Sequence, residues 1–409
     1  MRTLVPSLAM LLATVVAASP LGLASEEARR GASSATVPPS EAIANGAQIV
    51  FADGRRLAVA QALPSGGRGI VEWQRQAGDR DESASFSEVV AILWDERDPI
   101  GKGEPKMVMQ NGERYPGRLD RADGALRWMH PWLGPIAIDL EATRSISIDG
   151  SSPDSANGPS ADADRVRLAN GDLIEGLVAE IDREIGIESI ADGSVRRVPL
   201  EVVSRIDFLD SPRPPGSVRL EARDGTVVDV ESIRTSPSSL RDANRRGEPP
   251  TIELIRRSST SVSGPDPVSI PLHDFSAMLI APSRTTMLAA LAPKVEGVVG
   301  SDRSWLPAPS TGDRTAPIAQ QDVELSGPIR VRYELPKGTV LSSVATLPDT
   351  MRRFGDFELR ILDGSREVLR HRFSREEPRV SIATMIESGE LVIELHEGLH
   401  GPVQDRLLL

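Results

Sequence analysis

The feature that most constrains this chain is a short strand ending in a tight glycine turn, which occurs four times. Asn-Gly and Asp-Gly pairs after alternating apolar residues are typical of type I′ hairpin turns, in which both central residues take a positive φ. Each of the four segments is followed further along the chain by a short apolar strand, at residues 89–94, 144–148, 203–209 and 275–280. The pattern predicts a series of small antiparallel β-modules. The four opening segments read AQIVFADG (47–54), KMVMQNG (106–112), RVRLANG (165–171) and SVRLEARDG (217–225).

The third repeat shows this pattern most clearly. Between residues 165 and 209 it reads as about five short strands. In the second and third repeats a further glycine, Gly117 or Gly176, falls five residues after the turn glycine, where it would allow the sharp bend of a small barrel. The unit resembles an SH3-like or Sm-like barrel. An ordinary meander of hairpins with coincidental Asn-Gly turns is the alternative.

Composition excludes several functions. The chain has 409 residues, 47 Lys and Arg against 59 Asp and Glu, and a formal net charge of −12. Binding to phosphate backbones needs a basic surface, so we expect no nucleic-acid partner, although Sm-like barrels often bind RNA. There is no cysteine, which excludes disulfides, thiol nucleophiles and zinc–thiolate sites.

The first 24 residues have the pattern of a secretory signal peptide. A positive start precedes an apolar run over residues 4–18, and small residues at 22–24 offer a cleavage site. The run is shorter than the ~20 residues of a membrane-spanning helix. We therefore expect a secreted, periplasmic or envelope-associated protein with no membrane span after signal cleavage; an uncleaved anchor is the alternative.

Low-complexity segments predict the domain boundaries. The expected fold class is all-β, with small SH3/Sm-like barrel repeats followed by a galactose-binding-like antiparallel β-sandwich. In the last region, segments such as 329–333 and 357–361 alternate apolar and polar residues, as half-buried strands do. After the signal peptide (1–24) we expect a flexible leader at 25–42, two small repeats at 43–149, an acidic linker at 150–164, two further repeats at 165–281 with a loop at 235–250, and the sandwich at 288–409.

The C-terminal region also resembles a known family. The segments that carry the resemblance are SDRSW (301–305), RVRYELPKG (330–338), GDFELRILDGSREVL (355–369), ELVIELHEG (390–398) and GPVQDRLLL (401–409). They are similar to the novel putative carbohydrate-binding module (NPCBM) attached to glycoside hydrolase family 98 enzymes, which is common in large secreted proteins of planctomycete-type bacteria. The resemblance implies a galactose-binding-like sandwich whose loops bind sugar at one end. Two departures, QQDVELSGPI before the first core strand and the lack of a Trp after Asp405, fall at that loop end.

Five residues of this region are candidates for a site. Sugars bind to aromatic faces and planar polar side chains, which makes Trp305, His371, Arg372 and Asp405 candidates for carbohydrate binding. Asp349 and Asp405 are candidate ligands for a structural calcium ion, because hard oxygen donors suit Ca²⁺. The alternative for both aspartates is turn stabilisation. We expect no other cofactor.

Two further motifs have a structural interpretation beside a chemical one. Residues 396–400 read H-E-x-x-H, which binds zinc when a helix places both histidines on one face. A strand-like LVIEL precedes it and Gly398 interrupts it, so we interpret it as a polar loop. Trp128, His130 and Trp132 form the densest aromatic cluster, interpreted as core, with a ligand patch as the alternative.

These observations predict a secreted, non-catalytic binding protein. We expect its C-terminal sandwich to bind extracellular or envelope polysaccharide. A structural or protein-interaction component of the cell surface, with surface proteins as partners and a degenerate sugar site, is the main alternative. A secreted hydrolase is a third reading, although nothing singles out an acid pair or a metal site among the many carboxylates.

Overall fold

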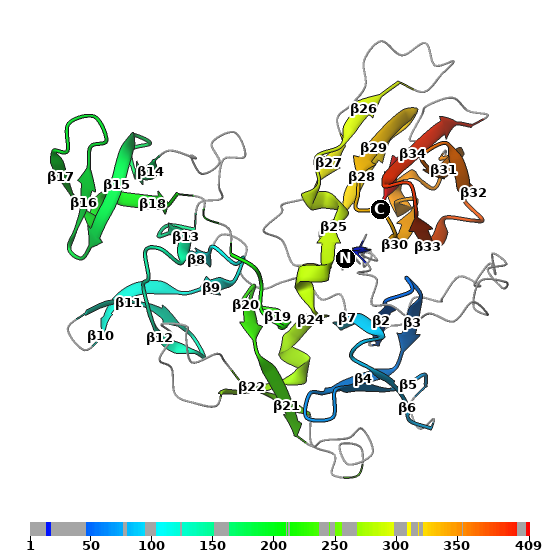
Figure 1. The fold of residues 1–409 in the computed structure, drawn as a ribbon, viewed down its shortest axis with the longest axis horizontal. Coiled ribbons are helices and arrows are strands. Elements are labelled where there is room, and N and C mark those ends of the chain that lie inside the picture. Colours follow the sequence, from blue (N-terminus) through cyan, green and yellow to red (C-terminus); the bar gives the residue numbers. More distant parts are fainter. Residues whose placement is uncertain are drawn as a thin grey trace, which may run out of the picture. The chain divides into compact units, whose positions relative to one another are not determined.

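The fold is built from antiparallel strands and short 3-10 turns (Figure 1). The expected all-β class is therefore confirmed. No helix in the described part of the chain is long and apolar enough to cross a membrane. The chain divides into two compact units, the first comprising Met1–Pro64, Gly69–Glu96 and Leu279–Leu409 and the second Ser65–Arg68 and Arg97–Met278. The computed structural model describes residues 14–17, 46–76, 80–94, 104–122, 125–150, 163–209, 211, 213–236, 245, 250–255, 268–297, 309–311, 318, 322–353, 355–398 and 406–409.

All four predicted repeats contain the same arrangement of three strands. In each, an opening strand is hydrogen-bonded to a second strand on one side and to a closing strand on the other. The opening strands of repeats 1 to 4 are β2 (Ala47–Phe51), β8 (Lys106–Met109), β14 (Asp164–Leu168) and β19 (Val218–Ala222). The second strands are β3 (Arg56–Val59), β9 (Arg114–Pro116), β15 (Leu173–Ile181) and β20 (Val227–Val230). The closing strands are β7 (Val89–Trp94), β13 (Thr143–Ser147), β18 (Val203–Asp207) and β24 (Phe275–Ile280).

The four hairpin turns share one geometry, which differs from the predicted type I′ turn. Only the glycine of each turn has a positive φ, and the preceding Asp or Asn does not. In repeat 2, Gly112 has φ 89° and its N–H donates to the Met109 carbonyl at 3.0 Å. The Asn111 side chain accepts the N–H of Glu113 at 3.1 Å, and equivalent bonds occur in the other three repeats. The turn is a three-residue loop with a glycine bulge, so the type I′ prediction is wrong: the Asn or Asp side chain caps the turn and its backbone does not reach positive φ.

A small three-stranded sheet completes repeats 1, 2 and 4, whereas in repeat 3 the last two strands continue a 14-stranded sheet from β15. Gly117 lies between β9 and the strand that follows it, and Gly176 lies within β15, where the pairing of this strand changes from β14 to the next strand. A Cβ on Gly176 would lie 2.6 Å from the Glu188 carbonyl oxygen, so only glycine fits this close approach. Among the described strands no sheet closes into a ring. The added strands are β4 (Gln61–Ser65), β5 (Ile70–Gln74), β6 (Glu82–Ser85); β10 (Arg118–Ala122), β11 (Ala125–His130), β12 (Gly134–Ala137); β16 (Glu184–Glu188), β17 (Val195–Pro199); and β21 (Ser232–Ser236), β22 (Thr251–Ile255), β23 (Val268–Pro271).

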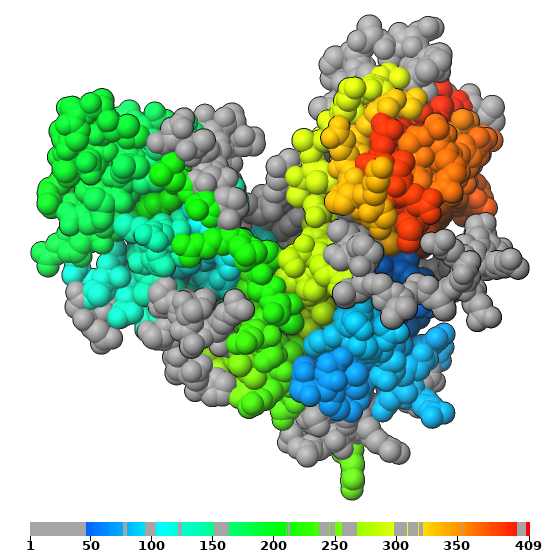
Figure 2. Space-filling model, viewed as in Figure 1, coloured from blue at the N-terminus to red at the C-terminus, as the bar shows by residue number. Residues whose placement is uncertain are grey.

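Repeats 2, 3 and 4 meet edge to edge within a 14-stranded sheet. Closing strands β13 and β18 pair, with Ile146 opposite Ile206, and second strands β9 and β20 pair, with Arg114 opposite Val227. Repeats 2 and 3 also share a buried cluster that includes Trp128. Figure 2 shows the two repeats, in cyan and green, packed against each other. Repeat 2 therefore uses its closing strand to contact repeat 3 and its second strand to contact repeat 4.

The C-terminal region of the first unit consists of two sheets that share one core. Phe357, Leu359 and Ile361 alternate inward on β31 and are fully buried, as the sequence pattern predicts. They join Leu341 and Ile382 of the other sheet in a single cluster. One sheet has the order β26 (Lys294–Glu296), β29 (Ile329–Glu334), β34 (Glu390–Glu397), β31 (Phe357–Asp363), β32 (Arg366–Phe373). The other contains β25 (Thr285–Met287), β1 (Thr14–Ala17), β30 (Thr339–Thr346), β35 (Arg406–Leu408), β28 (Val323–Ser326) and β27 (Ser310–Thr311), with β33 (Arg379–Ile386) paired to β30.

Strand β1 lies within the segment that the sequence assigns to a signal peptide. It pairs with β25 and β30. The signal peptide, the cellular location and the domain boundaries stay predictions of the sequence.

Candidate functional site

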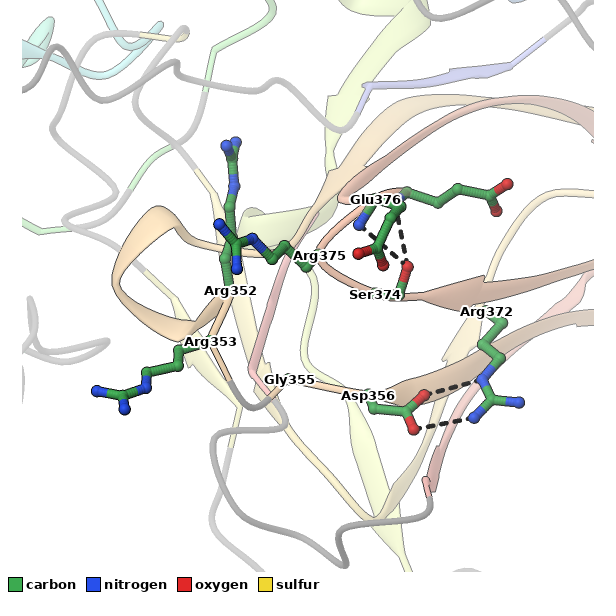
Figure 3. Close-up of a pocket in the computed structure, with 9 residues that line it drawn as sticks. Arg352, Arg353, Gly355, Asp356, Arg372, Ser374, Arg375 and Glu376 are labelled. Carbon is green, nitrogen blue, oxygen red and sulfur yellow. Dashed lines mark hydrogen bonds and ion pairs between the residues drawn. The ribbon is translucent and has the colours of Figure 1, made fainter.

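A pocket opens where two connections of the C-terminal sheets meet. The first connection joins β30 to β31 and contains the 3-10 turn η7 (Asp349–Met351), and the second joins β32 to β33. The pocket has a volume of about 470 Å³, within the range of small-ligand sites. Its lining residues are Arg352, Arg353, Gly355, Asp356, Arg372, Ser374, Arg375, Glu376 and Glu377 (Figure 3).

An ion pair joins the first connection to strand β32 in this pocket. The Nε and Nη2 atoms of Arg372 donate to the two carboxylate oxygens of Asp356, at 2.8 and 2.9 Å. The hydrogen bond with Asp356 and its negative charge raise the pKa of Arg372 above its ordinary value, so the guanidinium stays protonated. A bidentate pair holds both planar groups in fixed orientations. The pair therefore places a guanidinium donor group and a carboxylate acceptor group side by side.

The other arginines are positioned by turns. Arg352 directly follows the 3-10 turn η7, and its Nη2 atom lies 2.6 Å from Oδ1 of Asp349 in that turn. The Ser374 hydroxyl accepts the backbone N–H groups of Glu376 and Glu377 at 3.2 Å, which forms the tight turn that carries Arg375. In Figure 3 the Arg375 side chain is directed toward Arg352. These contacts fix the backbone around the pocket while the charged ends remain near its surface.

The lining defines what the pocket can bind. Arginines, carboxylates and one serine line it, and none of the nine lining residues is aromatic or histidine. Such a lining offers hydrogen-bond donors and acceptors to a hydroxyl-rich or acidic ligand.

The structure brings only part of the predicted site together. Arg372 lines the pocket, and Asp349 lies at its edge, paired with Arg352. His371 lies on the same strand as Arg372, but its ring packs edge-on against Phe373, with centroids 4.7 Å apart, and it does not line the pocket. Two further predicted residues, Trp305 and Asp405, lie outside the described residues.

The calcium site stays a prediction. Within the described part of the chain, no group of three or more His, Asp or Glu side chains could hold a metal ion. One predicted ligand, Asp349, has its carboxylate engaged by Arg352, and the other, Asp405, is not described.

Sequence reasoning missed most of the pocket. Asp356, Arg352 and Arg375 were not among its candidates. The available signal was the density of charged residues in two segments beside core strands. RRFGD (352–356) directly precedes β31, and RFSREE (372–377) begins at the end of β32.

The two remaining motifs have structural roles. His396 and Glu397 lie at the end of strand β34, so the prediction of a polar loop is wrong for these two residues, and His396 lies 2.9 Å from Glu394. His400 lies outside the described residues. His130 is buried; its Nε2 lies 2.8 Å from the Thr226 hydroxyl, and its Nδ1 accepts the Leu133 N–H at 3.1 Å. With Trp128 fully buried beside it, this cluster is core, as expected.

Comparison with known proteins gives little further guidance. No protein family and no curated protein matches this chain. A distant structural match is the M60 catalytic domain with the CBM51-1 and CBM51-2 domains from Clostridium perfringens ZmpB, at 9% identity and a TM-score of 0.26. The match covers 77% of this chain and 31% of that one. It assigns neither a family nor a function, and the NPCBM resemblance stays an interpretation of the sequence.

Proposed function

We propose that this chain is an exported, non-catalytic binding protein that binds carbohydrate in the pocket at Asp356 and Arg372. The ligand would be part of an extracellular or envelope polysaccharide. The observation that carries the proposal is the bidentate pair, which lines a pocket of about 470 Å³ beside the connections of a two-sheet β fold. The NPCBM resemblance of residues 288–409 supports the same reading.

The chemistry of the pair suits a sugar. Neighbouring hydroxyls of a pyranose each donate and accept hydrogen bonds, so a site needs both functions at close spacing. A charged group makes such bonds stronger than a neutral one does. The Asp356–Arg372 pair is already assembled, so binding would not need to order these two side chains.

Arginine substitutions on one strand provide a matched test. Arg372 and Arg370 both lie on β32, have similar side-chain exposures of 57% and 52%, and each forms a bidentate ion pair, with Asp356 and Glu367 respectively. Only Arg372 lines the pocket. We expect the full chain to bind at least one glycan on an array, and Arg372→Ala to weaken that binding about tenfold, the effect of one charged hydrogen bond.

The control variant changes the arginine that lies outside the pocket. Arg370→Ala should bind as the unchanged chain does. Equal losses in both variants would place the ligand elsewhere on the sheet, and the absence of binding to any glycan or polysaccharide would remove the carbohydrate claim.

A structural or protein-interaction role at the cell surface is the second candidate. The edge-to-edge assembly of repeats 2, 3 and 4 favours it, because modules that join through their strand edges can also join other proteins in this way. This role predicts that the protein remains in an envelope fraction that free sugars cannot elute.

A further inference from the structure

Exposed apolar side chains are concentrated on one repeat. Of the six large apolar residues that are strongly exposed in the described part of the chain, five lie in repeat 3 and the sixth is Met385 on β33. Isolated exposed apolar residues are normal, so the place of each residue within the repeat decides whether it marks an interaction surface. The five residues are Leu173, Leu177, Ile190, Val195 and Val202.

Leu173 occupies a position that the other repeats use for contacts between modules. It is the second residue after the turn glycine. In repeats 2 and 4 this position holds Arg114 and Val227, which are direct partners on paired strands. In repeat 1 it holds Arg56, which donates hydrogen bonds to the hydroxyl and the carbonyl oxygen of Ser342, both at 3.0 Å. Val227 is 2% exposed, whereas Leu173 is 45% exposed.

The contact between repeats 2 and 4 also has a polar part, and each repeat supplies one half of it. Repeat 4 supplies Arg219 and Asp229, joined by bonds of 2.8 and 2.9 Å. Repeat 2 supplies Asn111, whose carbonyl oxygen accepts a bond of 2.6 Å from Arg219, and Glu113, whose carboxylate accepts the Asp229 N–H at 2.8 Å.

Repeat 3 contains both halves of this polar contact. Arg165 and Glu175 stand at the positions of the repeat 4 ion pair and are themselves paired, at 2.9 Å. Asn170 and Asp172 stand at the positions of the repeat 2 asparagine and glutamate. The Glu175 side chain is 54% exposed, whereas Asp229 at the same position is 6% exposed. The surface of repeat 3 is therefore complementary to itself.

We propose that this surface of repeat 3 binds the same surface of a second molecule of this chain. The two molecules would be related by a two-fold axis, as repeat 2 is related to repeat 4 by the pairing of β9 and β20. Leu173 would lie opposite its counterpart, because Arg114 and Val227 at this position pair directly. An interface that uses the same patch on both molecules is the commonest form of dimer.

A single introduced cysteine tests this register, because the chain has no cysteine of its own. Directly opposed residues of antiparallel strands have Cα atoms about 4.5–5.5 Å apart, within the range of a disulfide. Under mild oxidation of the full chain, we expect Leu173→Cys to form covalent dimers. Met385→Cys is the control, since Met385 is similarly exposed but lies on the C-terminal sheets. Equal cross-linking of the two variants would overturn the proposal.

Sedimentation velocity supplies a test that needs no cross-link. We expect the unchanged chain to dimerise as its concentration rises, and Leu173→Glu to raise the dissociation constant at least about tenfold. Met385→Glu should dimerise normally. Both side chains are exposed, so both variants should keep their circular dichroism spectrum. An unchanged chain that stays monomeric throughout the titration, or a Leu173→Glu variant that still dimerises normally, would overturn the proposal.

Discussion

Arg114 and Val227 face each other on paired antiparallel strands, and each is the second residue after the turn glycine of its own repeat. The same position of the repeat therefore stands on both sides of the contact between repeats 2 and 4. Repeats 2 and 4 are related by a local two-fold axis that passes between these residues. Equivalent substitutions in different repeats can then be compared directly, because the backbone geometry is the same and only the environment differs.

The ion pair that occurs in both repeats 3 and 4 should differ in its importance for stability. Arg219→Met removes the ionic partner of the buried Asp229 carboxylate and leaves only the neutral donors of Asn111 and Gly216, which typically costs about 3 kcal/mol. Arg165→Met leaves Glu175 largely in water, which should cost less than about 1 kcal/mol. Urea denaturation followed by tryptophan fluorescence, in dilute protein, measures both changes. Equal destabilisation would contradict the assigned burial.

The shared turn geometry predicts a cost for losing its glycine. Gly171 has φ 93° and open space around the position of a Cβ, so Gly171→Ala tests backbone strain alone. We expect a loss of about 1 kcal/mol in the free energy of unfolding. Gly67 also has open space but no positive φ. Gly67→Ala should be neutral or stabilising by up to about 1 kcal/mol. A neutral Gly171→Ala would rule out the bulge geometry.

Asp363 should make the C-terminal sheets sensitive to acid. Its burial raises its pKa, but hydrogen bonds from Ser388 and Arg366, at 2.8 and 2.9 Å, outweigh burial and hold the pKa below its ordinary value. A depressed carboxyl pKa stabilises the fold above the unfolded value of about 3.9, and this stabilisation is lost as the pH falls through the folded pKa.

The corresponding variant gives the measurement. Asp363→Asn should lower the thermal midpoint at neutral pH, and its deficit should shrink as the pH falls below about 4. If Asp363→Asn lowers the thermal midpoint equally at pH 7 and in acid, the charge of Asp363 does not account for its contribution to stability.

The sequence located the four hairpins because the glycine of each turn must adopt a positive φ that other residues avoid. It could not give the turn type. Asn-Gly suits both a type I′ turn and a glycine bulge, and the choice depends on whether a side chain such as that of Asn111 caps the N–H two residues later. The inward residues of β31 were predictable for a different reason, since alternation with period two is explicit in the sequence.

The pocket was harder to predict than the fold. Arg372 was found as a planar polar residue near the sandwich, but its partner Asp356 is 16 residues away on another connection. That pairing depends on how β31 and β32 bring the two connections together. Charged residues are common on any surface, so sequence alone does not mark which of them share a pocket.

The use of two distinct edges limits how an array of this kind can grow. Closing strands meet closing strands, and second strands meet second strands, so adjacent repeats alternate in direction. A single repeat placed in the sheet between repeats 2 and 4 would put unlike edges against each other at one junction. Placing two repeats there restores the match. A single repeat can be added only at an end of the array, where repeat 3 pairs its closing strand with that of repeat 2.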